Sequence, residues 1–213
     1  MKVELLEIFG DDDMVVNAAR VSFGKEAANY SEENNARLIK YLAEYNHTSP
    51  FRHPQIQYRI TCPIFVERQL FKHQVGLTAN SISGRYVDFE DNYYKIDNFR
   101  LQSKSSKQGS QGNLDINNND EALIIQDAVI NYCATAYNEL LQLGVAKEQA
   151  RAVLPLCLET TFIWTGSLLA YINLFKLRIT RDTQVETMQI AQEMLQKLKL
   201  TNKFIHSLNA FYL

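Results

Sequence analysis

Long hydrophobic runs are missing from this sequence of 213 residues. No apolar stretch approaches the roughly twenty residues that a membrane-spanning helix requires. The first residues, Met-Lys-Val-Glu, also lack the apolar segment of a signal peptide. We therefore expect no membrane partner and a cytoplasmic location.

Cysteine is scarce as well, and its three positions, Cys62, Cys133 and Cys157, are widely spaced without any Cys-x-x-Cys pair. Isolated thiols in odd number argue against a disulfide framework or a zinc site and suit a reducing cytoplasm. We expect no metal centre. Cys62 falls on the apolar face of a predicted strand, so we expect it to lie in the core.

Excess charge of one sign is the third absence. The formal net charge is −2 and the pI is about 6.1, so no global field would attract nucleic acid or an anionic membrane. We expect no nucleic-acid partner, and any anion site must be built locally. The sequence also lacks internal repeats and the Gly-x-x-x-x-Gly-Lys-Ser/Thr phosphate loop.

Apolar residues make up 46% of the chain, enough for one substantial core. Strict alternation over Gln55–Cys62 predicts a strand with one buried face, and Val3, Leu5 and Ile8 indicate another. Periodicity, caps and stop signals predict helices elsewhere, and the aromatic end of the chain is expected to dock on the body. The predicted helices cover Asp11–Arg20, Ser31–Asn46, Pro63–His73, Glu121–Leu143, a segment from Ala146 to before Pro155, an apolar segment ending at Leu177, and Thr183–Leu200.

These elements predict an α+β fold, with an antiparallel or mixed sheet packed by long helices, in one domain spanning residues 1–213. The polar run Gln102–Gly112 predicts a surface loop over about residues 101–118, with a phosphate cradle as the alternative. Three helices are expected to bury an apolar stripe. The stripes comprise Leu38, Ile39, Leu42 and Tyr45; Ile125, Val129, Tyr132, Ala136 and Leu140; and Val185, Met188, Ala191, Leu195 and Leu198.

The most informative stretch is Phe65–Tyr86, which begins as a predicted helix and ends as a polar loop. On a helix reaching His73, the side chains of Gln69, Lys72 and His73 would share one face. The loop that follows is dense in hydroxyl, amide and guanidinium groups. Such a segment either faces water or holds a polar ligand, because burial without partners is costly.

Within this stretch stand Arg-Gln-x-Phe-Lys-His-Gln at residues 68–74 and Asn-Ser-x-Ser-Gly-Arg-Tyr at residues 80–86. They resemble the signature of flavin-dependent thymidylate synthases, Arg-Gln-x-x-Arg-His-Arg followed by Asn-Glu-x-Ser-x-Arg-Tyr. Lys72 and Gln74 replace two arginines, and Ser81 replaces the glutamate. The spacer between Gln74 and Ser83 is one residue longer than usual.

Four more segments resemble the same family in matching order: residues 18–23, 47–53, 144–156 and 173–178. The last contains Asn173 and the family's Leu-x-x-Leu-Arg, which ends at Arg178. Ser167 and Leu169 stand where the family usually has Asn and Arg.

The resemblance implies dUMP as substrate, FAD as cofactor, NADPH and 5,10-methylenetetrahydrofolate as co-substrates, and a homotetramer whose active sites lie at subunit interfaces. Arg178 would be the catalytic residue. The residues implied for dUMP are Gln69, Lys72, Ser81, Ser83, Gly84, Arg85, Arg151 and Arg178. Those implied for flavin and folate are His47, Ser49, Lys72, His73, Gln74, Ser81, Ser167 and Asn173.

Methylation at C5 of uracil requires a nucleophilic C5, produced either by thiolate addition at C6 or by drawing ring charge towards a cation. None of the three cysteines lies beside a histidine in the sequence, which disfavours the thiolate route. Arginine supplies a permanent positive charge, and the resemblance assigns that role to Arg178.

Two alternatives remain open because of the changes at Lys72, Gln74, Ser81 and Leu169. One is an enzyme of the same fold with altered chemistry, such as a pyrimidine nucleotide hydroxymethylase or a synthase for another nucleotide. The other is a nucleotide-binding paralogue that has lost flavin and catalysis.

Overall fold

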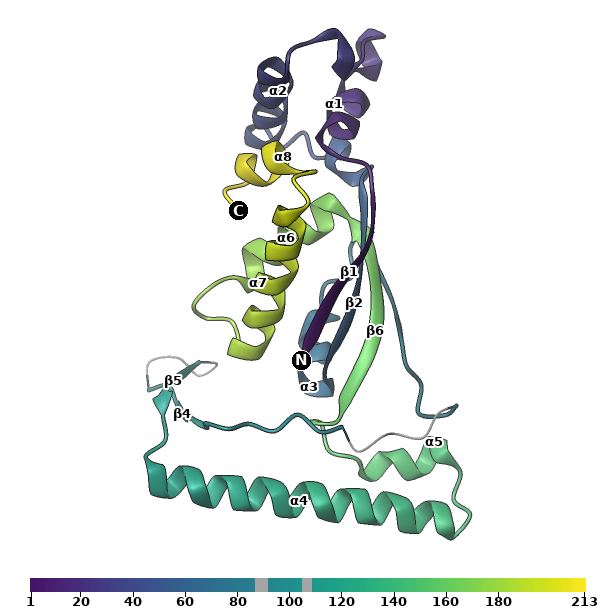
Figure 1. Cartoon of the computed structure of the whole chain (residues 1–213), viewed down its shortest axis with the longest axis vertical. Helices are drawn as coiled ribbons and strands as arrows, with labels where there is room; N and C mark the ends of the chain where they lie inside the picture. Colours follow the sequence, from purple (N-terminus) through teal and green to yellow (C-terminus); the bar gives the residue numbers. More distant parts are fainter. Residues whose placement is uncertain (87–91, 105–108) are drawn as a thin grey trace. The chain divides into compact units, whose positions relative to one another are not determined.

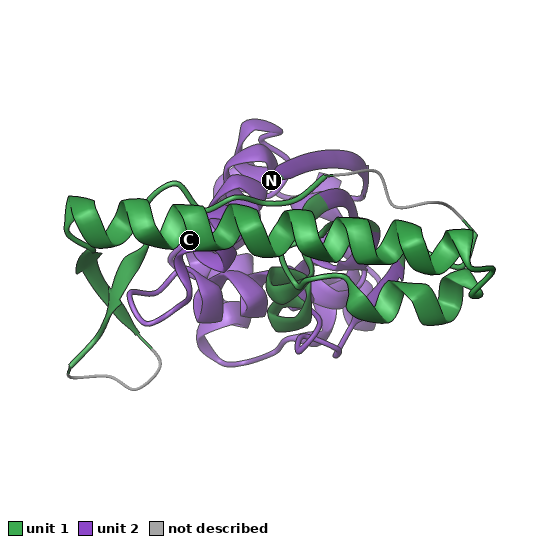
Figure 2. Cartoon of the chain, turned by 90° about the horizontal axis from the view of Figure 1, so that it is seen from below, with its two compact units in different colours: residues 1, 61–70, 81–162 green, residues 2–60, 71–80, 163–213 purple. Residues whose placement is uncertain are grey.

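The computed structural model describes residues 1–86, 92–104 and 109–213, and Figure 1 shows the order of its elements. The chain forms two compact units, coloured in Figure 2. Unit 1 comprises residues 1, 61–70 and 81–162, and unit 2 comprises residues 2–60, 71–80 and 163–213. In the described part of the chain, no helix has both the length and the apolar character to cross a membrane.

A four-stranded sheet has the order β1-β2-β6-β3, formed by Lys2–Phe9, Gln55–Pro63, Glu159–Ser167 and Leu77–Ser81. A second sheet pairs β4 (Arg100–Gln102) antiparallel with β5 (Ser110–Asn113), with an irregularity between Arg100 and Leu101. Together with eight α-helices among the described residues, these sheets confirm the predicted α+β class.

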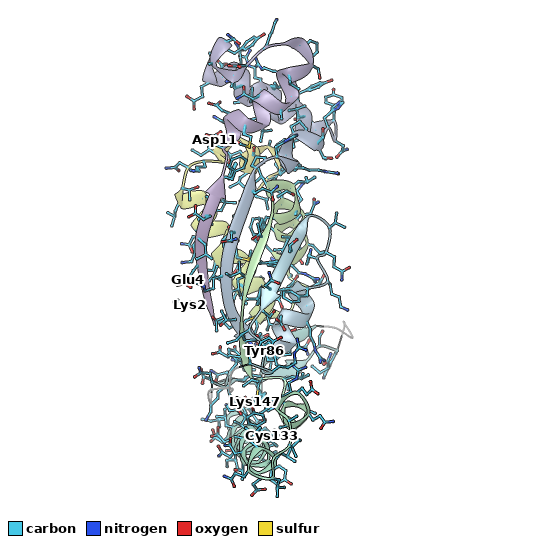
Figure 3. The ribbon with its side chains drawn as sticks, turned by 90° about the vertical axis from the view of Figure 1, so that its right-hand side faces the viewer. Lys2, Glu4, Asp11, Tyr86, Cys133 and Lys147 are labelled. Atoms are coloured by element: carbon cyan, nitrogen blue, oxygen red, sulfur yellow. The ribbon has the colours of Figure 1, made fainter. Side chains whose placement is uncertain are left out.

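Unit 2 contains helices α1 (Asp12–Arg20), α2 (Glu32–Glu44), α6 (Leu168–Arg178), α7 (Val185–Leu200) and α8 (Ile205–Ala210). The predicted starts of α1 and α2 are confirmed, because the side chains of Asp11 and Ser31 accept hydrogen bonds from the backbone N–H groups of Met14 and Asn34. Asp11 is labelled in Figure 3, as are Lys2 and Glu4, whose side chains form an ion pair of 2.9 Å on β1.

Aromatic side chains fill the core of unit 2. Tyr58, Trp164 and Tyr171 are almost fully buried, and both tyrosine hydroxyls are satisfied by backbone carbonyls. The rings of Trp164 and Tyr171 meet edge to face with their centroids 6.0 Å apart. Helix α6 belongs to this core, as its apolar sequence predicts. Phe204, Leu208 and Phe211 are also buried, which confirms that the aromatic end docks on the body.

Unit 1 contains α3 (Ile64–Leu70), α4 (Ile116–Gln142) and α5 (Lys147–Ala150). The segment predicted as a polar loop instead forms β4, β5 and the start of α4 in its described part. The stripe predicted to be buried on α4 is mostly exposed: Ile125, Val129 and Tyr132 are 57%, 50% and 77% exposed. Ile130 and Tyr137 are the buried residues of this helix. Helical periodicity predicted the helix correctly, but it did not predict which face of the helix is buried in the single chain.

Two other local predictions were wrong. Helix α3 ends at Leu70, so Lys72 and His73 lie in the following turn and do not share a helix face with Gln69. Tyr45 is 64% exposed although Ile39 and Leu42 are buried as predicted. Asn173, which the resemblance implies for the flavin, lies on an exposed position of α6. On α7, Ala191, Leu195 and Leu198 are buried as predicted, whereas Val185 and Met188 are half-buried.

Candidate active site

The guanidinium of Arg178 and the imidazole of His73 form the central pair of the candidate site in unit 2. Arg178 is the last residue of α6, and its Nε–H donates a hydrogen bond to His73 Nε2 over 2.8 Å. Both side chains are half-buried. The pair therefore joins two residues predicted for the site that stand 105 positions apart in the sequence.

The turn at Gly76 holds the segment after His73 close to the start of α6. Gly76 has φ of 73°, and its carbonyl accepts a hydrogen bond from Ser167 N–H over 3.1 Å. A Cβ atom at Gly76 would lie 3.2 Å from Ser167 Oγ and 3.3 Å from the Cβ of Ala170. Only glycine meets both the backbone conformation and the close approach without strain.

The hydrogen bond determines which ring nitrogen of neutral His73 carries the proton. Nε2 accepts the Arg178 N–H, so the neutral ring carries its proton on Nδ1. Burial, and then the positive charge of Arg178, lower the pKa of His73 below its ordinary value. Burial also lowers the pKa of Arg178, although a guanidinium remains charged at neutral pH. The pair thus places a fixed cation beside a neutral hydrogen-bond donor.

A second polar group lies in unit 1, on the segment that follows β3. Ser83 Oγ accepts a hydrogen bond from Arg85 N–H over 3.4 Å, and Ser83 C=O accepts one from Tyr86 N–H over 3.0 Å. Gly84, within this turn, is buried. The Arg85 side chain is exposed, and its guanidinium carbon lies 5.3 Å from the centroid of the Tyr86 ring. A turn with an exposed guanidinium and a hydroxyl suits an anion such as a phosphate.

Glu67 is a residue that the sequence reasoning missed. It lies on α3, and its Oε1 accepts a hydrogen bond from Ser81 Oγ over 2.7 Å. Burial raises the pKa of Glu67, and the hydrogen bond from Ser81 opposes that rise. A carboxylate two positions before Gln69 was the available signal, but helix spacing alone places these two side chains on different faces.

The other residues predicted for the nucleotide lie on separate elements. Gln69 is half-buried on α3, Lys72 is exposed after it, and Arg151 is exposed on the short helix η4 (Arg151–Val153). Arg151 Nε donates a hydrogen bond to the Glu148 carbonyl over 3.3 Å. Their common role remains a prediction.

Most residues predicted for flavin and folate are exposed in unit 2. His47, Ser49, Gln74 and Asn173 all present polar groups to solvent, from four different segments. Ser167 differs, because it is buried and its Oγ accepts a hydrogen bond from Ala170 N–H over 3.3 Å as the N-cap of α6. Its position supports a structural role in starting the helix that ends at Arg178.

The thiols are poorly suited to nucleophilic attack. Cys62 is fully buried as predicted, and burial, reinforced by the charges of Glu67 and Glu159, raises its pKa to about 12. Burial raises the pKa of the Cys157 thiol as well. Cys133, labelled on α4 in Figure 3, is half-buried. An active thiolate requires a lowered pKa and access, so the raised pKa values of Cys62 and Cys157 disfavour covalent addition of these two sulfurs to a uracil ring.

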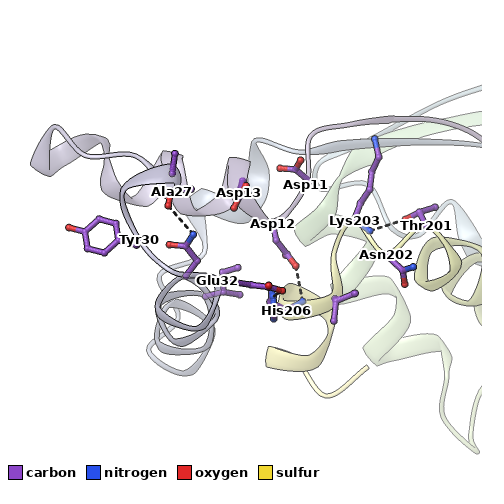
Figure 4. Close-up of a pocket in the computed structure, with 14 residues that line it drawn as sticks. Asp11, Asp12, Asp13, Ala27, Tyr30, Glu32, Thr201, Asn202, Lys203 and His206 are labelled. Carbon is purple, nitrogen blue, oxygen red and sulfur yellow. Dashed lines mark hydrogen bonds and ion pairs between the residues drawn. The ribbon is translucent and has the colours of Figure 1, made fainter.

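A cavity of about 550 Å³ lies among α1, α2 and α8 in unit 2 (Figure 4). None of the residues predicted for nucleotide or flavin lines it. Three of its polar side chains have structural partners: Asp12 accepts from the backbone N–H groups of His206 and Ser207, and Glu32 pairs with His206 over 3.3 Å. Among the described residues, no group of three or more His, Cys, Asp and Glu side chains could hold a metal ion.

Comparison with known proteins identifies the family. Residues 4–201 match the model of thymidylate synthase complementing proteins. The chain belongs to this family. The membership confirms the family resemblance and the prediction that the chain is an enzyme of the methyltransferase type.

Relatives and solved structures agree with this family. The chain is 40% identical to a flavin-dependent thymidylate synthase of Thermus thermophilus over 197 residues, 92% of this chain and 71% of that protein. It is 39% identical over 189 residues to the enzyme of the same name from Kosmotoga olearia, covering 89% of this chain and 81% of that one. A crystal structure of the UMP/dUMP methylase PolB from Streptomyces cacaoi, bound with 5-Br dUMP, has a TM-score of 0.87 and 27% identity, with 99% and 94% of the two chains covered.

Proposed function

We propose that this member of the thymidylate synthase complementing protein family catalyses the reductive methylation of dUMP to dTMP. The carbon donor is 5,10-methylenetetrahydrofolate, and FAD reduced by NADPH is the source of hydride. The observation that carries the proposal is the pair of Arg178 and His73, with its fixed cation and neutral ring. The names of the relatives, flavin-dependent thymidylate synthase and dUMP methylase, support the same reaction.

Arg178 activates the pyrimidine in this proposal. Its Nε–H donates to His73, and we assign the planar, permanently charged guanidinium to a uracil carbonyl. A cation held there stabilises negative charge on the ring and makes C5 nucleophilic, because charge develops where the guanidinium is already positioned. No thiolate is required, in keeping with the raised pKa of the buried Cys62 thiol.

The nucleotide is held mainly by polar groups of unit 1. We assign the phosphate to Arg85, Ser83 and Arg151, because guanidinium groups bind phosphate through charge-assisted, forked hydrogen bonds. Gln69, Lys72, Ser81 and the backbone at Gly84 complete the set. Lys72 can attract the phosphate as a point charge, although it lacks the fork of an arginine.

Polar groups exposed in unit 2 fit the isoalloxazine, ribityl and phosphate groups of a flavin. We assign His47, Ser49, Lys72, His73, Gln74 and Asn173, together with Ser81 and Ser167. His73 would act through Nδ1–H as a donor, since Nε2 is engaged by Arg178. Reduced flavin, when bound, supplies the hydride that completes the methyl group. The protein's part is to position the reactants and to hold the guanidinium charge.

We further propose that the 213 residues work as one catalytic domain within a cytoplasmic homotetramer, with active sites at subunit interfaces. Support comes from α4, whose apolar residues remain uncovered in the single chain: Ile116, Ile124, Ile125, Val129 and Tyr132 are 50–77% exposed. Ile125, Val129 and Tyr132 share one face of the helix, and exposed apolar surface of this kind is typical of an interface. Light scattering tests the assembly, and a monomer at micromolar concentration would contradict it.

The test of the reaction uses the purified full chain. It should be yellow or should bind added FAD, and it should convert dUMP to dTMP with folate and NADPH. A colourless protein that binds no FAD while retaining dUMP would favour the paralogue that has lost flavin. Mass spectrometry separates the hydroxymethylase alternative, because a hydroxymethyl product carries one more oxygen than a methyl product. That alternative is considered because Lys72, Gln74 and Ser81 differ from the residues usual at these positions of the family signature.

A further inference from the structure

We propose that the Glu67 carboxylate, held by Ser81, accepts a hydrogen bond from the 3′-hydroxyl of the nucleotide sugar. The inference rests on the proposed function, which gives Ser81 and its neighbours to the nucleotide. It adds a specificity-determining residue that the sequence motifs do not contain.

The geometry links the acid to the nucleotide segment. Glu67 lies on α3 and Ser81 ends β3, and the distance from Ser81 Oγ to Glu67 Oε1 is 2.7 Å. A hydroxyl donating to a carboxylate at this distance makes a strong, charge-assisted contact. The hydrogen bond orients the carboxylate towards the side chain of Ser81, across 14 positions of sequence.

The residue at position 81 explains why this contact bears on nucleotide binding. Ser81 stands where the related signature has glutamate, so the carboxyl group is missing from that side chain. Glu67 brings a carboxylate to within hydrogen-bonding distance of the Ser81 hydroxyl. A carboxylate on the neighbouring helix therefore lies beside the side chain of residue 81.

In the described part of the protein Glu67 forms no ion-pair contact, although the charge of Arg68 opposes the rise of its pKa, and Ser81 is its one side-chain hydrogen-bond donor there. A half-buried carboxylate has an unfavourable free energy unless donors surround it. Burial raises the pKa of Glu67 accordingly. The remaining lone pairs are free to accept a hydrogen bond from a ligand.

The repulsion between carboxylate and phosphate, and the few residues between Ser81 and Arg85, indicate that the ligand group is the sugar. A carboxylate repels a phosphate, so it must meet a neutral part of the nucleotide that carries a donor. Ser81 is two residues from Ser83 and four from Arg85, and an extended chain spans at most about 3.5 Å per residue. The carboxylate therefore contacts the same short segment that carries two of the proposed phosphate groups. The sugar adjoins the phosphate, whereas Arg178 is assigned to the base.

The experiment compares dUMP with 2′,3′-dideoxy-UMP, which lacks only the 3′-hydroxyl. Wild-type protein should bind dUMP on the order of 10-fold more tightly, the effect of one hydrogen bond to a charged group. Glu67→Gln removes the charge with almost no change in volume, and it should abolish most of this preference. The double variant Glu67→Ala with Ser81→Glu returns the acid to position 81 and should restore the preference.

The control is Glu121→Gln, the same change of charge at an exposed position of unit 1, which should keep the wild-type preference. Thermal unfolding and flavin absorbance are recorded for every variant. A Glu67→Gln protein that still prefers dUMP as the wild type does would overturn the inference, as would equal weakening for both nucleotides. Wild-type protein that binds neither nucleotide would instead defeat the proposed function.

Discussion

Removing the charge of Arg178 should raise the pKa of His73. In Arg178→Gln the 2.8 Å contact with a cation is lost, so protonation of the imidazole no longer meets repulsion. Burial is the larger cause of the lowered pKa and Arg178 the second, so most of the depression should persist in the variant. The pKa should therefore move upward but stay below its ordinary value.

The expected energy follows from Coulomb's law. Two unit charges about 4 Å apart repel by about 1 kcal/mol in water and about 4 kcal/mol at an effective dielectric constant near 20. Both side chains are half-exposed, so we expect the lower end, a change of roughly five-fold in the protonation equilibrium.

NMR titration of the imidazole protons measures this pKa. The chain has four histidines, and the signal lost in His73→Gln assigns the resonance. The sign for stability follows: because the folded pKa is lowered, the unfolded chain binds the proton more readily. This group therefore contributes full stability above its ordinary pKa of about 6.5, and the contribution falls as the pH drops through the folded pKa. A His73 pKa that stays constant or decreases in Arg178→Gln would refute the electrostatic coupling.

Three further variants test the support of the site. Gly76→Ala should lower the free energy of unfolding by about 1–2 kcal/mol, because the new Cβ meets Ser167 and Ala170 at positive φ; an unchanged melting temperature would contradict this reading. Ser167→Ala should cost about 1 kcal/mol in thermal unfolding through loss of the α6 N-cap, with Ser167→Asp as the capping control; unchanged stability would contradict the capping role. Cys62→Ala should lower stability but keep dTMP formation once the folded fraction is taken into account, and inactive folded protein would point to a role for sulfur.

Local features were predictable from the sequence. Asp11 and Ser31 cap helices because their short polar side chains reach the first free N–H groups, a property of a few neighbouring residues. The alternation over β2 was equally informative, since Ile56, Tyr58 and Ile60 are all buried. Both signals depend on short stretches of chain.

Features that depend on distant segments were missed. Periodicity places Ile125, Val129 and Tyr132 on one face of α4, but only the surrounding structure decides whether that face is covered. The contacts of His73 with Arg178 and of Glu67 with Ser81 arise from tertiary folding, and no local pattern encodes them. The resemblance supplied His73, Arg178 and Ser81 as candidates, whereas Glu67 required the structure.

The most direct test of the account is the rate of dTMP formation by Arg178→Ala at saturating dUMP, folate and NADPH. A permanent charge that stabilises the reacting ring predicts a loss of at least about 10²-fold in kcat with the flavin spectrum retained. Arg181→Ala, an exposed arginine three residues further on, is the matched control and should keep the wild-type rate. Undiminished turnover in Arg178→Ala would contradict the claim that this guanidinium, rather than a thiolate, makes C5 reactive.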